Sequence, residues 1–125
     1  MIEQQKSESY ESDRTFRLYG FHVSHSRLLF RAPRSESDPV SENIDIKFYD
    51  VDYLETTWLY HGISIRETQG DELLKLKERC GALSGQGDKF FSLNTDTGTF
   101  YIGAAAYSVS ANRLPPLDFG FDNLE

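Results

Sequence analysis

The sequence is poor in the features that mark secreted and membrane proteins. It has one cysteine among 125 residues, so no disulfide can form within the chain. No stretch approaches the ~20 consecutive apolar residues that a membrane-spanning helix requires. The first residues, MIEQQKSESYESD, lack the basic start and apolar centre of a secretory signal peptide. We therefore expect a cytoplasmic protein that makes no contact with a membrane.

Motifs for catalysis and cofactor binding are also missing. The glycine-rich stretch GALSGQGDK lacks the Gly-Lys-Ser/Thr of a phosphate-binding loop, and no G-x-S-x-G marks a serine as a nucleophile. Cys80 falls at the end of a predicted helix, where the helix dipole opposes a thiolate, so we expect it to pack rather than react. The sequence thus favours a non-enzymatic protein with no catalytic residue, no cofactor and no metal.

The net charge of −7 is carried mainly by the two ends of the chain. Residues 1–13 hold four acids and one lysine, and residues 115–125 hold three acids and no base. Residues 14–114 are nearly neutral, with 13 acids and 12 bases. Acidic ends favour solubility and repel nucleic acids and anionic membranes. The charge therefore argues against nucleic acid as a partner.

Alternating apolar residues predict a β-sheet. Within residues 43–67, Ile44, Ile46 and Phe48 share one face of an extended chain, and the residues between them are charged. This pattern is typical of a half-buried antiparallel strand. Further strand-like runs occur at 15–34, 58–66, 89–93, 99–102 and 107–112. We predict an antiparallel sheet of about six or seven strands, either curled or arranged in two layers.

One short helix is predicted at residues 71–80. Leu73 and Leu76 recur at helical spacing, Leu74 widens the apolar stripe, and Gly81 is a typical residue to follow a helix end. A helix of about ten residues is too short to persist alone, so it must dock on the sheet. The expected fold class is therefore α+β, dominated by the sheet.

The chain length suits one globular domain. We place this domain at residues 15–114. The polar segment 1–14 has no apolar period and is expected to be a disordered acidic leader. Residues 115–125 form a proline-containing acidic tail.

A charge contrast separates two neighbouring segments. Residues 14–34 hold five arginines, two histidines and no acid, whereas residues 36–55 hold seven acids and one lysine. One interpretation is an RNA or polyanion surface on the 14–34 hairpin, with Tyr19 and Phe21 stacking on bases. The other is that arginine and carboxylate side chains meet across adjacent strands on the solvent face. We favour the second, because neighbouring acids cancel the field that nucleic-acid binding requires.

The three histidines raise the question of a metal site. His22 and His25 form an H-x-x-H motif, and His61 follows on a later strand. Residues three apart on a strand point to opposite faces, but a turn at 24–26 would let the two rings approach. No cysteine accompanies a possible three-histidine zinc site, so we expect ordinary histidines.

The alternative to a non-enzymatic protein is a small enzyme or a ligand-binding pocket. Its candidate residues are His22, His61, Arg17 and Arg31. This hypothesis requires the four side chains to converge in a concave site within hydrogen-bonding reach.

Aromatic residues suggest a contact surface. By strict alternation, Trp58 and Tyr60 lie on the strand face opposite Leu59, Ile63 and Ile65. In a single-layer sheet these two rings would be exposed and would form a ligand or protein contact. In a two-layer sheet they would belong to a second buried face.

The tail sequence LPPLDFGF adds two aromatic residues, Phe119 and Phe121, which either pack over the sheet or form a short binding motif. We therefore expect a small cytoplasmic binding or accessory protein of inhibitor, immunity or regulatory type. Its expected contact residues are Trp58, Tyr60, Phe119 and Phe121. Its expected partner is another protein, a small ligand or a second copy of the chain.

Overall fold

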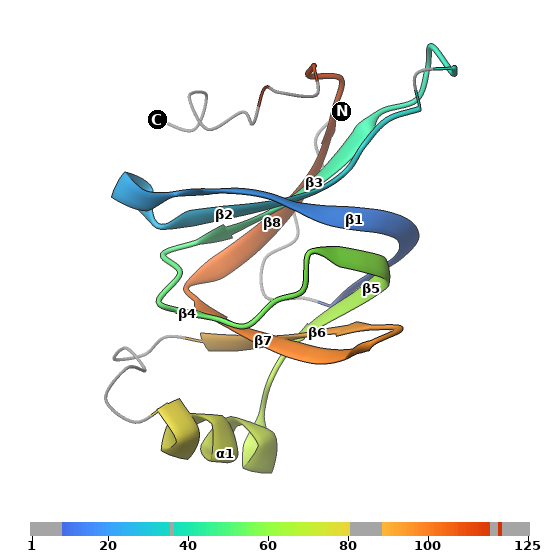
Figure 1. Ribbon diagram of the computed structural model, residues 1–125. Coiled ribbons are helices and arrows are strands. Elements are labelled where there is room, and N and C mark those ends of the chain that lie inside the picture. The colour runs from blue at the N-terminus through green and yellow to red at the C-terminus, as the bar shows by residue number, and fades with distance from the viewer. Residues whose placement is uncertain (1–8, 36, 81–88, 116–117, 119–125) are drawn as a thin grey trace.

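A computed structural model describes residues 9–35, 37–80, 89–115 and 118 of the chain (Figure 1). The elements, in chain order, are β1 (Tyr10–His22), the short 3-10 helix η1 (Val23–His25), β2 (Arg27–Ala32), β3 (Asn43–Tyr49), β4 (Tyr53–Leu54), β5 (Leu59–Glu67), α1 (Gly70–Cys80), β6 (Lys89–Thr95), β7 (Gly98–Ala104) and β8 (Ala106–Asn112). Among these residues, α1 has 11 residues, and no helix is long and apolar enough to cross a membrane.

The eight strands form one antiparallel sheet in the order β4-β7-β6-β5-β1-β2-β3-β8. Strands β7 and β8 are separated in the chain only by Ala105, yet they lie near opposite ends of this order. The sheet therefore curls over itself, so that β3 and β8 lie across the core from β6 and β7 (Figure 1). Within the described residues, β4 and β8 are not paired with each other, and the sheet stays open.

This architecture confirms the expected α+β class with a dominant antiparallel sheet and one short helix. The strand number is eight rather than six or seven. The additional strand is β4, which has only two residues. Strand β1 begins at Tyr10, inside the segment 1–14 assigned to a disordered leader, and residues 1–8 lie outside the described part of the chain.

The curled sheet encloses one main core. Phe48 on β3 stacks on Tyr107 of β8, with ring centroids 5.5 Å apart, and both rings contact Phe91 of β6 at 5.8 and 5.2 Å. Aromatic pairs at such separations add to the burial of apolar area. Strands that are not neighbours in the sheet therefore meet through their aromatic side chains.

Two irregularities decide which side chains face this core. The first lies at Gly20, where the register of β1 against β2 shifts between Leu18 and Gly20, as in a β-bulge. A second irregularity lies at Gly62, whose φ of 80° is in the left-handed region that favours glycine. It changes the phase of β5, so that Tyr60 and Ile63 both point into the core. The expectation of strict alternation in this strand is wrong for that reason.

Gly103 marks the place where the β3–β4 connection crosses β7. A Cβ atom there would lie 2.7 Å from Oδ1 of Asp52 and 3.0 Å from Cβ of Tyr53. The amide of Asp52 donates a hydrogen bond to the carbonyl oxygen of Gly103 at 2.9 Å. The absence of a side chain at Gly103 allows this close approach of the two segments.

Helix α1 packs on the outer side of the sheet. Leu76 is buried against Phe90, and Leu73, Tyr53 and Tyr101 surround this contact. Leu74, expected to widen the apolar stripe, is 62% exposed and does not take part. The helix therefore buries a narrow stripe over β6 and β7, apart from the main core.

Candidate functional site

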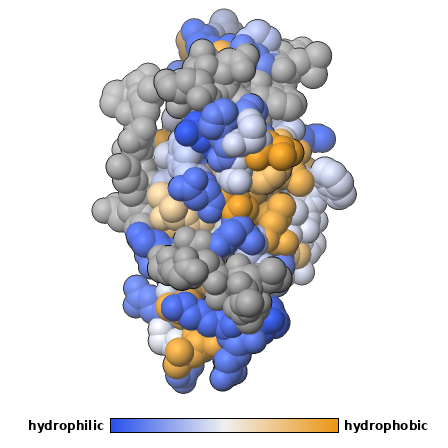
Figure 2. All heavy atoms as spheres, turned by 90° about the vertical axis from the view of Figure 1, so that its left-hand side faces the viewer, coloured by the Kyte–Doolittle hydropathy of each residue, from blue (hydrophilic) through white to orange (hydrophobic). Residues whose placement is uncertain are grey.

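Four large apolar side chains are exposed on the β1–β2 hairpin, on β4 and just before β5. Trp58 is 75% exposed, Val23 79%, Phe21 43% and Leu54 41%. We refer to these four residues as the apolar rim. Figure 2 views the molecule from the side of the β1–β2 tip and β4, and shows apolar residues grouped on that face.

Strand register shows on which side of the sheet two of these side chains, Phe21 and Leu54, lie. Side chains of directly paired residues lie on the same face of a sheet. Phe21 pairs with the core residue Leu28, and Leu54 pairs with the core residue Ile102. Both rim residues therefore lie on the core-facing side of their strands, yet remain partly exposed. They mark an end of the core that is open to solvent.

Trp58 lies immediately before β5 and is paired with β1. Its carbonyl oxygen accepts a hydrogen bond from the amide of Leu18 at 3.0 Å, and Leu18 packs against the main core. The backbone beside the indole is therefore fixed by pairing, although the ring itself is exposed. A fixed backbone with an exposed aromatic ring is a favourable arrangement for a contact residue, because little freedom is lost on binding.

Tyr60, the second predicted contact residue, has a different place. Its ring is fully buried, between Phe30 at 5.4 Å and Phe100 at 5.8 Å. Its hydroxyl lies 2.8 Å from Oγ1 of Thr56. Tyr60 is therefore a core residue and does not share an exposed face with Trp58, which corrects its prediction as a contact residue. Burial raises the pKa of its hydroxyl.

The connection after β3 brings carboxylates next to the rim. Asp50 is exposed and has a positive φ of 55°. The amide of the next residue, Val51, donates a hydrogen bond to the carbonyl oxygen of Ser26 at 3.0 Å, which fixes the connection against the β1–β2 tip. The apolar rim is therefore bordered by an acidic loop.

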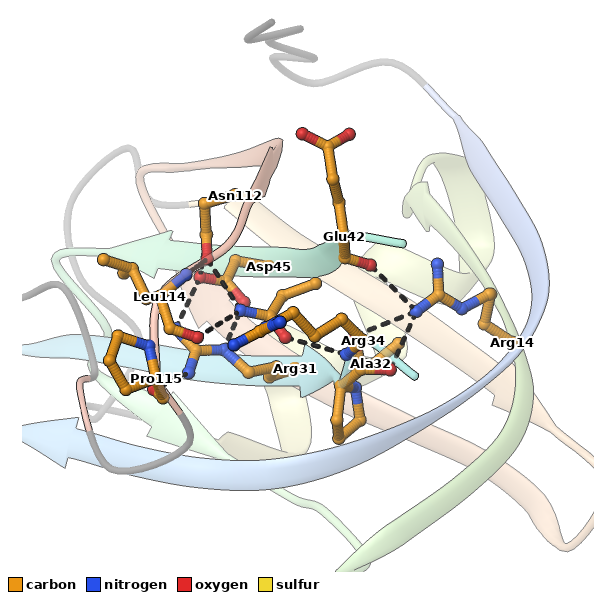
Figure 3. A network of polar contacts seen from close by, with 11 residues as sticks. Arg14, Arg31, Ala32, Arg34, Glu42, Asp45, Asn112, Leu114 and Pro115 are labelled. Carbon is orange, nitrogen blue, oxygen red and sulfur yellow. Dashed lines mark hydrogen bonds and ion pairs between the residues drawn. The ribbon is translucent and has the colours of Figure 1, made fainter. Parts of the chain in front are cut away.

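A buried polar network lies on the outer face of β2, β3 and β8. Arg31 and Asp45 are fully buried and form a bidentate pair, with 2.7 Å from Nε to Oδ1 and 3.0 Å from Nη2 to Oδ2. Asn112 donates a hydrogen bond to Oδ2 of Asp45 at 2.7 Å. Figure 3 shows these side chains beside the segment that runs on to Leu114 and Pro115.

The buried pair corrects one part of the prediction that arginine and carboxylate side chains meet on the solvent face of adjacent strands. Arg31 and Asp45 are directly paired across β2 and β3, so arginine and carboxylate do meet across the ladder, but away from solvent. Burial by itself would lower the pKa of Arg31, and the hydrogen bonds and charge of Asp45 more than offset that effect, so that its pKa is raised. Burial lowers the pKa of the neighbouring Lys47. Both carboxylate oxygens of Asp45 accept hydrogen bonds, so we interpret the network as structural.

Arg14 also serves the structure. Its Nη2 donates hydrogen bonds to the carbonyl oxygens of Ala32, Pro33 and Glu42 at 3.2, 3.0 and 3.2 Å. It thereby holds both ends of the β2–β3 connection to β1 (Figure 3). Arg14 and Arg31, two of the five arginines that suggest a polyanion surface, thus bind other groups of the protein itself.

The four residues of the alternative pocket do not converge. Arg31 is buried in its pair with Asp45, and His22 lies at the β1–β2 tip beside His25. His61 pairs with Thr15, seven residues before His22 on β1, which places the two histidines roughly 20 Å apart at ~3.3 Å per residue. Arg17, between them along β1, is exposed. The described geometry gives no support to a pocket or catalytic centre built from this set.

His61 instead lines an open groove of about 820 Å³ on the other side of β1 and β5. The groove is lined by Tyr10, Glu11, Ser12, Asp13, His61, Gly62, Ile63, Ser64, Asn94, Thr95 and Asp96. These residues come together only through the pairing of β1 with β5 and of β5 with β6, so no local pattern in the sequence groups them.

Other predicted contact residues lie outside the described part of the chain: Phe119 and Phe121 fall among residues 119–125. Phe21, Val23 and Leu54 were missed as contact residues. The available signal for Phe21 was the bulge at Gly20, which returns Phe21 to the core-facing side. No sequence signal indicated that this side is open at its end.

Comparison with known proteins found no match to a family model, to a curated protein or to a solved structure. The functional assignment therefore rests on the geometry of the apolar rim.

Proposed function

We propose that this protein is a non-enzymatic binding protein that contacts another protein through the apolar rim. The observation that carries the proposal is Trp58, the only tryptophan of the chain, which is 75% exposed on a hydrogen-bonded backbone. Tryptophan is among the residues most often found to dominate binding energy at interfaces. Phe21, Val23 and Leu54 add further exposed apolar area to the rim.

A partner protein suits this surface better than a small molecule. Small ligands bind in concave sites that bury most of their area. The indole of Trp58, by contrast, is mostly in contact with solvent, and the large groove of the molecule lies elsewhere. A broad contact that covers Trp58 and its neighbours is the arrangement that would remove this apolar area from water.

The negative charge beside the rim indicates what kind of protein would bind there. Asp50 borders the rim, and its exposed carboxylate places a negative charge at the edge of the apolar surface. Two copies meeting through their rims would bring like charges together, which opposes association. We therefore assign the rim to a different protein, one that presents an apolar anchor flanked by lysine or arginine.

The test compares three tagged proteins expressed in native cells: wild type, Trp58→Ala, and Leu74→Ala as a control that removes an exposed apolar residue from helix α1. The expected result is a partner retained by wild type and by Leu74→Ala but lost with Trp58→Ala. With the purified partner, we expect Trp58→Ala to weaken binding about 30-fold or more, which corresponds to a hot-spot loss of ~2 kcal/mol.

Trp58 also supplies its own probe, since the chain has no other tryptophan. Binding at the rim should shift its fluorescence emission to shorter wavelength. A partner captured equally by wild type and Trp58→Ala, or a partner that leaves the emission unchanged, would refute the proposal. Light scattering that shows a dimer disrupted by Trp58→Ala would assign the rim to self-association instead.

A further inference from the structure

The tip of the β1–β2 hairpin brings two imidazole rings together. His22 ends β1, and η1 turns the chain so that His25 returns beside it. Their Nδ1 atoms are 2.9 Å apart and their ring centroids 4.7 Å apart. The left-handed conformation of Ser26, with φ 51° and ψ 46°, completes this turn. The turn expected at 24–26 therefore brings the two histidine rings together, which the H-x-x-H spacing could not do on a regular strand.

The two rings approach each other through the same ring atom, Nδ1. One neutral imidazole donates its Nδ1–H to the lone pair of the other Nδ1 at this distance. Oγ of Ser24 lies 3.3 Å from both Nδ1 atoms, on the same side. Two ring nitrogens and one hydroxyl oxygen thus converge on a single position at the surface.

We propose that this position is a site for a divalent transition-metal ion, held by Nδ1 of His22 and Nδ1 of His25. Imidazole nitrogens bind such ions at ~2.0–2.1 Å. At that bond length, two nitrogens 2.9 Å apart subtend an angle of about 90° at the metal, whereas a tetrahedral angle would need about 3.3–3.4 Å. An angle near 90° suits adjacent ligands of a square-planar or octahedral ion.

Copper(II) and nickel(II) are the ions that the geometry selects. Both accept tetragonal or octahedral arrangements of nitrogen and oxygen ligands, and copper(II) binds most tightly in the general order of affinities. The ion takes the place of the shared proton, so each ring then carries its proton on Nε2. Among the described residues, no group of three or more His, Cys, Asp and Glu side chains gathers for a metal. The remaining coordination positions are therefore left to Ser24, to water or to a ligand from outside.

The test is titration of the full chain with Ni²⁺, followed by isothermal calorimetry in a buffer that does not bind metal. Wild type should bind one equivalent. His22→Asn and His25→Asn should each weaken this binding at least tenfold. His61→Asn is the matched control, because it removes the only other histidine, in a groove roughly 20 Å away, and should leave binding unchanged.

Substoichiometric Cu²⁺ localises the site independently of any variant. Its paramagnetism should broaden the NMR signals of residues 22–26 before those of residues 61–64 and 94–96. The Cu²⁺ complex should also show a tetragonal electron paramagnetic resonance spectrum with two nitrogen ligands, lost in His25→Asn. Thermal melts in EDTA check that the variants are folded. Unchanged Ni²⁺ binding in both tip variants, or an equal loss in His61→Asn, would overturn the proposal.

Discussion

Arg31 and Asp45 face each other across β2 and β3 with both side chains fully buried, and the arginine grips both carboxylate oxygens at 2.7 and 3.0 Å. Two opposite charges removed from water stabilise a fold only if every polar atom finds a partner. Here Asn112 supplies a further donor to the carboxylate. The pair therefore couples β2 and β3 to β8, the end strand of the sheet, on the side away from the main core.

Breaking this pair should be costly. Arg31→Met leaves the Asp45 carboxylate buried without its main partner, so we expect a loss of about 3–5 kcal/mol in the free energy of unfolding, measured by urea titration. Arg17→Met is the control: Arg17 pairs directly with Arg31 on β1 but is exposed, and its loss should cost no more than about 0.5 kcal/mol. The double variant Arg31→Met, Asp45→Leu should recover much of the stability, because it leaves no unpaired charge. Equal losses in Arg31→Met and Arg17→Met would contradict this account.

Gly103 should not tolerate a side chain. In Gly103→Ala the new methyl group would lie 3.0 Å from Cβ of Tyr53, an atom close to the backbone that cannot move away freely. We expect a loss of about 1–3 kcal/mol, as for other overpacked sites. Combining it with Asp52→Ala removes the 2.7 Å contact with Oδ1 but not the contact with Tyr53. The double variant should therefore stay less stable than Asp52→Ala alone, and equal stability of the two would refute the close crossing.

Helix α1 should depend on one leucine. Leu76 is buried against Phe90, so Leu76→Ala should cost about 2–5 kcal/mol. Leu74 lies two residues earlier in the same helix and is 62% exposed, so Leu74→Ala has the same chemistry without the burial and should change stability by less than about 0.5 kcal/mol. Thermal or urea unfolding of the two variants measures the difference directly. Similar losses would mean that the helix does not dock through Leu76.

Tyr60 should make stability fall in alkaline solution. Its pKa in the folded protein is raised by burial above the usual value of about 10, so the folded state holds a proton that the unfolded state has released. The contribution of Tyr60 to stability should therefore be constant below about pH 10 and decline as the pH rises from there towards the raised pKa. Lys47, whose pKa is lowered, acts in the opposite sense, so the effect must be measured as a difference between two proteins that both keep Lys47.

The comparison is with Tyr60→Phe, which keeps the ring and removes the titrating hydroxyl. At neutral pH it should lose about 1 kcal/mol, through the hydrogen bond with Thr56. Above pH 10 the gap between wild type and Tyr60→Phe should narrow, as followed by urea unfolding at several pH values. A gap that stays constant up to pH 11 would show that Tyr60 does not titrate differently in the folded and unfolded states.

Local patterns in the chain were sufficient to predict most of the secondary structure. The alternation around Ile46 and the turn between the two H-x-x-H histidines depend on residues close in sequence, and the structure shows both at the predicted positions. Helix α1 begins within one residue of its predicted start, because capping and apolar spacing act within a few turns.

The surface and the site depended on contacts between distant segments. The phase change at Gly62 turned Tyr60 inward, and the pairing of Arg31 with Asp45 placed the charges in the interior rather than on the solvent face. The strands, the helix and the turns follow from local sterics and from the spacing of apolar residues, so they can be read from the chain alone. The exposure of Trp58, Phe21 and Leu54 at the open end of the curled sheet follows only from the packing of distant segments. The exposure of a side chain depends on which other parts of the chain cover it, and a local sequence pattern cannot predict that.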